Sequence, residues 1–138
     1  MIKNIVDLIG RIFLASVFIF EAVDTIKFYD ETKATLTELN IVWQQDFLLT
    51  SGIIILIIGS CLFITGYRTG FATTILLLYW IPATFLVYDF WNFPRGEQRI
   101  VVMVFTKNLS VMGGMLILWV NGSKAYSIRK ILATTKVR

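Results

Sequence analysis

Six polar side chains lie inside or at the edges of long apolar stretches, where ionisable groups are costly. The six are Glu21, Asp24, Lys27, Asp89, Lys107 and Asn108. The first three follow one another at intervals of three residues, which on a helix places them on one slanted stripe and lets Asp24 pair with Lys27. Carboxylates and lysines inside a membrane bind ligands, carry protons or pair with one another. We therefore treat these six residues as candidate site residues.

Four apolar stretches, each long enough to cross a bilayer as a helix, must position these residues. They cover residues 5–28, 47–66, 70–91 and 101–121, and residues 122–138 follow as a basic tail. Charges interrupt the first stretch and no signal-peptide cleavage motif follows it, so we expect it to be a retained helix. Short connections favour antiparallel neighbours. We predict an all-α integral membrane protein, a single membrane domain (1–138) folded as an up-down bundle of four transmembrane helices.

The charges outside the four stretches predict the orientation of the chain. Basic residues dominate the N-terminus, the turn at 67–69 and the tail, whereas acidic residues dominate the opposite side. By the positive-inside rule both termini are cytoplasmic, which indicates a multi-pass protein of a bacterial or archaeal inner membrane. Arg11, Arg129 and Lys130 are expected at lipid headgroups, with a helix C-terminus as the alternative partner of Arg11. The net charge of +4 thus indicates a lipid surface rather than nucleic acid.

With this orientation, the outer ends of the first, third and fourth helices meet at one depth. The six candidate residues then converge in one layer, which predicts a polar pocket toward the outer third of the bilayer. Two alternatives remain open. Glu21 or Asp24 can form a purely structural ion pair with Lys107, and Asp89, Lys107 and Lys27 can reach the headgroup region.

The composition excludes several classes of protein. With 57% hydrophobic and 16% charged residues and a mean hydropathy of +0.73, the chain is too apolar for an ordinary soluble domain. It has no histidine and one cysteine, Cys61, which we expect to be buried. Histidine-ligated haem, a Ser-His-Asp triad and an intrachain disulfide are therefore excluded, and we expect no metal site and no catalytic residue of the chain's own.

Small residues and one proline predict how the helices pack. The glycines expected at helix contacts are Gly52, Gly59, Gly66, Gly113 and Gly114. The first three recur every seven residues and so lie along one stripe, which packs inside the bundle or forms a dimer face. Pro82 is expected to kink the third helix and to open a cavity beside Tyr79, Trp80 and Thr84.

Four motifs of the chain also match the pattern of a known family. An Arg opens and a Lys closes the first helix, GRIFLASVFIFEAVDTIKF, and the second, LLTSGIIILIIGSCLFITGYRTG, ends in G-x-R. The third ends in YDFWNF and the fourth opens with FTKNLSVMGGMLIL, which has the form F-x-K-N-L-x-x-x-G-G. Over residues 10–122 the chain resembles the DoxX family of small four-helix membrane proteins. It departs from the pattern at Tyr88, where His is frequent, and in the acidic Glu21 and Asp24.

The resemblance implies a non-catalytic accessory subunit of a membrane complex, one linked to quinone redox chemistry. Its polar pocket would take a quinone or a lipid, and its partners would be the bilayer, other subunits or a second copy. One alternative is a redox enzyme subunit that reacts with quinone, with Glu21 or Asp24 beside Tyr79 or Tyr88. Such a subunit would need a partner that carries the electrons. A small transporter or channel is a further alternative.

Overall fold

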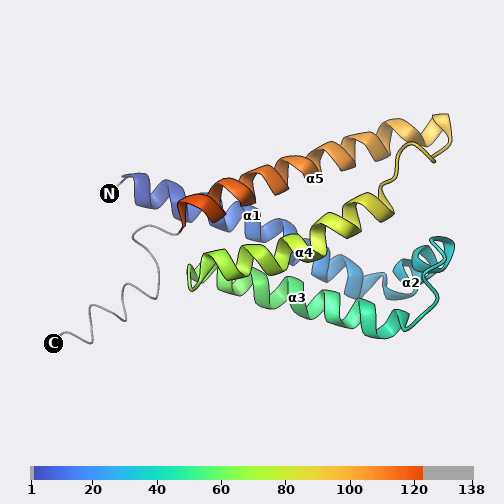
Figure 1. Cartoon of the computed structure of the whole chain (residues 1–138), viewed down its shortest axis with the longest axis horizontal. Coiled ribbons are helices and arrows are strands. Elements are labelled where there is room, and N and C mark those ends of the chain that lie inside the picture. The colour runs from blue at the N-terminus through green and yellow to red at the C-terminus, as the bar shows by residue number, and fades with distance from the viewer. Residues whose placement is uncertain (1, 123–138) are drawn as a thin grey trace.

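The computed structural model describes residues 2–122, which form five helices and no strand (Figure 1). In chain order they are α1 (Ile2–Lys27), α2 (Tyr29–Glu38), α3 (Gln45–Thr65), α4 (Thr69–Val87) and α5 (Arg95–Asn121). This described part of the chain is therefore all-α, as predicted. By length and composition, α3, α4 and α5 can each cross a membrane. The similarly long α1 is not among these candidates because Asp7, Arg11, Glu21 and Asp24 interrupt its apolar residues.

The four long helices run up and down in chain order. α1 packs against α3, α3 against α4 and α4 against α5, whereas α1 and α5 touch less. The start of α1, the α3–α4 turn and the end of α5 lie together at one end of the molecule (Figure 1). We call this the turn end. The opposite end, the α2 end, holds α2 and the α4–α5 connection.

A central apolar core joins the four long helices. Phe18 of α1 and Trp80 of α4 meet edge to face, with ring centroids 4.9 Å apart. Leu56 of α3 and Met115 of α5 are fully buried in the same cluster. Large apolar side chains such as Phe20 nevertheless point outward from the bundle. Such an outer surface suits lipid better than water.

The connection between the first two long helices contains a helix that the sequence analysis does not predict. This is α2, a short polar helix with one buried residue, Leu36. Asp30 and Glu31 in its first turn favour a helix because acidic groups interact well with a helix N-terminus. A search for long apolar stretches misses such a helix because most of its residues are polar.

Three further expectations are corrected. α4 ends at Val87, before the predicted 91, and α5 begins at Arg95 rather than 101. Pro94 precedes α5, and proline is well suited to a helix start because it lacks the N–H that would be unpaired there. Cys61 is exposed rather than buried, because it lies on the outer face of α3.

Candidate functional site

A cavity of about 980 Å³ lies at the α2 end, among α1, α2, α3 and α4. Pockets that hold small molecules measure about 300–1,000 Å³. The walls of this α2-end pocket are mostly apolar and include Leu36 of α2, Leu39 directly after α2, Ile55 of α3 and Leu86 of α4. Its polar lining residues are Glu21, Asp24, Thr25, Glu31, Thr32, Thr35, Ser51, Tyr79 and Tyr88. An apolar cavity with a few polar groups is the usual form of a ligand site.

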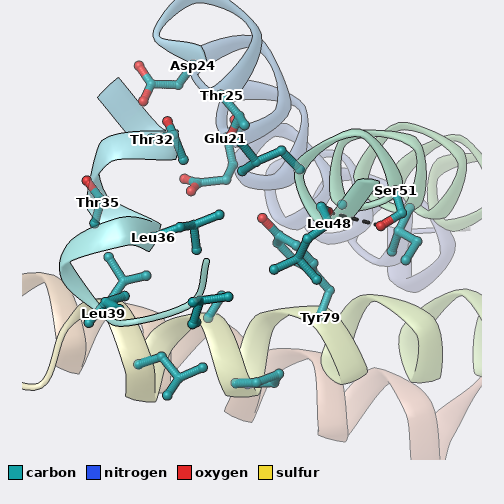
Figure 2. Close-up of a pocket in the computed structure, with 18 of the residues that line it drawn as sticks. Glu21, Asp24, Thr25, Thr32, Thr35, Leu36, Leu39, Leu48, Ser51 and Tyr79 are labelled. Carbon is teal, nitrogen blue, oxygen red and sulfur yellow. Dashed lines mark hydrogen bonds between the residues drawn. The ribbon is translucent and has the colours of Figure 1, made fainter. Parts of the chain in front are cut away.

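Glu21 supplies the innermost charge of the α2-end pocket. Its side chain is half-buried and points into the pocket from α1, whereas the exposed Asp24 lies at the rim and points away from Tyr79 (Figure 2). The Thr25 hydroxyl donates to the main-chain carbonyl of Glu21 at 2.9 Å and leaves its carboxyl group untouched. Within residues 2–122, neither acid forms an ion pair. A ligand could therefore supply the partner that Glu21 lacks.

Tyr79 faces Glu21 from the other side of the pocket. It reaches in from α4, as Figure 2 shows, and passes directly over Gly52 of α3. A Cβ at Gly52 would lie 2.6 Å from the Cε2 atom of the Tyr79 ring, closer than real contacts allow. Because glycine has no Cβ, it leaves the space that the Tyr79 ring occupies. The phenol brings both an aromatic face and a hydroxyl to the pocket.

Polar contacts fix α2 over the pocket. The Lys33 ammonium donates to both carboxylate oxygens of Asp46, at 2.7 and 2.8 Å, and the Tyr29 hydroxyl donates to the same carboxylate at 3.1 Å. The hydrogen bond to Asp46 raises the pKa of the Lys33 ammonium. Deeper in, the buried Gln45 amide donates to the Thr37 hydroxyl at 2.9 Å and to the carbonyl of Ile41 at 2.7 Å. These contacts join α2 to the start of α3.

The structure divides the six predicted site residues. Glu21 and Asp24 line the α2-end pocket, but Lys27, Asp89, Lys107 and Asn108 do not. The expected pairs of Asp24 with Lys27, and of Lys107 with either pocket acid, are not formed. Asn108 instead donates to the Thr84 hydroxyl at 3.3 Å, which ties α5 to α4.

The YDFWNF motif, which contains Asp89, lies in the connection between α4 and α5 and packs its aromatic rings against α5. The rings of Phe90 and Trp91 pack edge to face with Phe105 of α5, at centroid distances of 5.2 and 6.3 Å. The Asp89 carboxylate accepts a hydrogen bond from the Asn92 amide within the same loop. Asp89 therefore serves the connection rather than the pocket. Lys107 is exposed on α5 and makes no ion pair with residues 2–122.

Arg11 occupies the turn end and requires a correction. Its side chain is only 1% exposed, so it does not reach lipid headgroups. It pairs with Asp7 one turn earlier at 3.3 Å and donates from Nη1 to the carbonyl of Ile64 at 3.2 Å. Ile64 lies in the last turn of α3, where unpaired carbonyls attract a cation. The helix C-terminus, the other expected partner, is therefore the one observed. Arg129 and Lys130 lie outside the described residues.

The predicted packing glycines have different roles. A Cβ at Gly59 would lie 2.7 Å from the Leu76 side chain, so Gly59 and Gly52 both allow α4 to approach α3 closely. Gly66 instead ends α3 in a left-handed conformation, with φ of 66°. A Cβ at Gly114 would be in ordinary contact with Leu14, and one at Gly113 would meet nothing.

Several pocket residues were not among the candidates. Pro82 and Tyr79 line the cavity, whereas Trp80 and Thr84, which were expected beside it, are buried elsewhere. The contribution of α2 was missed altogether. Its sequence carried a signal, because Thr32, Leu36 and Leu39 follow the spacing of one helix face. Among residues 2–122, no three His, Cys, Asp or Glu side chains gather as metal ligands.

Comparison with known proteins identifies two families. The DoxX family model matches residues 6–89, from α1 to just beyond α4. The model of the SURF4 family matches residues 50–131, from α3 onward. No curated protein and no solved structure matches the chain.

Proposed function

The chain belongs to the DoxX family, and from this membership we propose a non-catalytic subunit of a membrane complex that binds a lipophilic ligand in the α2-end pocket. The apolar helices and the family together make it a membrane protein. The ligand would have an apolar body and a polar head, as a quinone or a lipid has. The observation that carries this proposal is the pocket itself, apolar in its walls and polar at Glu21 and Tyr79.

We further propose that α1 is a fourth transmembrane helix, with both termini cytoplasmic in a bacterial or archaeal inner membrane. The charges of α1 do not oppose this topology. Arg11 is buried and satisfied by Asp7 and Ile64, so its charge is not presented to lipid. Glu21 lines the pocket, and Asp24 lies one turn after Glu21, near the end of α1. The apolar outer face of α1, with Phe13 and Phe20, supports contact with lipid.

The pocket offers a lateral route for such a ligand. Leu48 of α3 and Leu78 and Leu86 of α4 line the cavity yet are exposed on the outside of the bundle. Because Leu78 lines the cavity and is 70% exposed, we propose that the cavity opens beside it at the surface of α4. A ligand dissolved in the bilayer could thus enter from the side without first passing through water.

A probe-binding experiment tests the ligand-binding part of this proposal. Purified protein in neutral maltoside micelles is expected to bind radiolabelled decylubiquinone or hexadecanol saturably. Filling the pocket with Ala83→Phe should abolish that binding, because Ala83 lines the cavity. The control Ile117→Phe, on the exposed face of α5, should leave it intact. Saturable binding that survives Ala83→Phe would place the site elsewhere and refute the proposal.

Purification tests the subunit role. A tagged chain extracted gently from its native membrane should elute with further membrane proteins in fixed proportion. Elution of the chain alone, also after chemical cross-linking in the membrane, would contradict a role as a subunit.

A second candidate is a quinone-reactive subunit of a redox enzyme. It is favoured by one observation, the presence of the Glu21 carboxyl group and the Tyr79 hydroxyl in the same apolar pocket. Together they can donate hydrogen bonds and a proton to a quinone, while a partner protein supplies the electrons. Tyr79→Phe would then lower quinone turnover by the intact complex. Unchanged turnover would exclude this role of the hydroxyl.

A further inference from the structure

The charged groups that line the α2-end pocket are all acidic. Glu21, Asp24 and Glu31 are lining residues, and no lysine or arginine is. Residues 21–46 contain six acidic side chains and only two lysines, Lys27 and Lys33. Lys33 is bound to Asp46, and neither lysine lines the pocket. The pocket therefore has acceptors for a positive charge but no basic group for a negative one.

Aromatic rings line the same pocket. Phe28, Tyr79 and Tyr88 all line the pocket, and Tyr79 lies across from Glu21 (Figure 2). Aromatic faces attract cations, and groups of them recognise quaternary ammonium heads in water-poor sites. A pocket lined by carboxyl groups and several rings is thus better suited to an ammonium group than to a neutral carbonyl.

We propose that the α2-end pocket selects a lipophilic cation, an alkylammonium compound whose head lies between Glu21 and the aromatic rings. This inference rests on the proposed function, namely that the pocket binds a lipophilic ligand, and it names the chemistry of the head group. The alkyl chain lies along the apolar walls formed by Leu36, Ile55 and Leu86. Anionic amphiphiles are excluded because they would bring a like charge to three carboxyl groups.

The rim of the pocket favours capture of the same class of ligand. Asp24 and Glu31 are both exposed, and both line the pocket. Exposed acids next to an apolar wall concentrate amphipathic cations near the entrance. The cation then exchanges these solvated acids for the half-buried Glu21, where its charge interacts more strongly.

A matched series of probes tests the selection. Hexadecyltrimethylammonium, hexadecanol and palmitate share one chain length and differ in head-group charge. Their saturable binding is measured by scintillation proximity on immobilised protein in neutral maltoside micelles, with excess unlabelled probe as the background. We expect the cation to bind about tenfold more tightly than the alcohol, and palmitate to bind most weakly.

Two variants assign the selection to its residues. Glu21→Gln should bring the affinities of the cation and the alcohol to within about threefold of each other, because only the cation loses its partner. Unchanged binding of hexadecanol to this variant shows that its pocket is folded. The matched control Glu38→Gln, at an exposed acid of α2 outside the lining, should keep the wild-type preference.

The outcomes separate this inference from the function on which it rests. If hexadecanol binds as tightly as the cation to the wild type, the pocket binds lipophilic ligands but the charge preference is refuted. The same conclusion follows if Glu21→Gln keeps the full preference. If none of the three probes binds saturably, the proposed function and the inference both fail.

Discussion

Replacement of Arg11 by methionine tests whether the buried charge at the turn end is structural. Arg11 is 1% exposed, pairs with Asp7 at 3.3 Å and donates to the carbonyl of Ile64 at 3.2 Å. Methionine keeps a long, flexible apolar stem and so leaves little empty space. The charge and its hydrogen bonds are what the substitution removes.

The expected loss follows from what remains behind. Breaking a buried ion pair by removing one partner costs about 3–5 kcal/mol, because the other charge is left without compensation. Here that partner is the carboxylate of Asp7, which is only 11% exposed. The carbonyl of Ile64 also loses a charged donor. We therefore expect Arg11→Met to lower the free energy of unfolding by about 3–5 kcal/mol. The double variant Arg11→Met/Asp7→Leu should recover most of this loss, because no unpaired charge remains.

The free energy is measured by titration of the protein in mixed micelles with dodecyl sulfate, followed by tryptophan fluorescence. Trp80, packed against Phe18 in the core, reports the loss of packing between α1 and α4. Arg99→Met, at an exposed arginine of α5, is the matched control and should change stability by less than about 0.5 kcal/mol. If Arg11→Met were as mild as this control, Arg11 would not hold α1 to α3 and the reasoning would be refuted.

Two further predictions concern the α2 end. Gly52→Ala should lower stability by about 1–3 kcal/mol and weaken ligand binding, because the new Cβ displaces the Tyr79 ring. The control Gly113→Ala should be neutral or stabilising by up to about 1 kcal/mol in the same titration, and neutral in the probe assay, since a Cβ there meets nothing. Equal losses of stability and of binding in both variants would contradict the role of Gly52. The Lys33–Asp46 contact should hold α2 at neutral pH and release it as the pH rises through the raised pKa of Lys33, above 10.5. Spin labels on α2 and α3 should show a broader distance distribution above that pH in the wild type. The variant Lys33→Met should show the broader distribution at all pH values. If its distribution at neutral pH were identical to that of the wild type, the Lys33–Asp46 contact would not hold α2 in place.

The long helices were predictable because the length of each apolar stretch and the shortness of the connections can be read directly from the sequence. The turn between α3 and α4 is three residues long, Gly66 to Arg68, so these helices can only be antiparallel. The helix ends were less predictable because hydropathy does not report helix propensity. The polar residues that open α5 and the whole of α2 are helical for local reasons that the apolar pattern does not contain.

The direction of each candidate side chain could not be predicted from the sequence. Rise per residue gives the level of a residue along its helix, but it does not say which way its side chain points. Neighbouring residues on a helix differ in direction by about 100°. Asn108 therefore faces Thr84 of α4 while Lys107, one residue earlier, is exposed. Only packing between helices, which a single sequence does not give, settles such rotations.

Two charged groups on α1 show how the same helix can serve stability and binding separately. Arg11 and Glu21 are about 15 Å apart along the helix axis, at a rise of 1.5 Å per residue. Arg11 is satisfied within the chain, whereas Glu21 points into a cavity and forms no ion pair with residues 2–122. A buried charge that its own protein satisfies contributes to folding, and one left unpaired in a cavity is available to a ligand. The double variant Arg11→Met/Asp7→Leu, which retains the fold, should therefore keep the preference for the cationic probe. Glu21→Gln should lose that preference without loss of stability, because a half-buried carboxyl group without an ion-pair partner contributes little to folding.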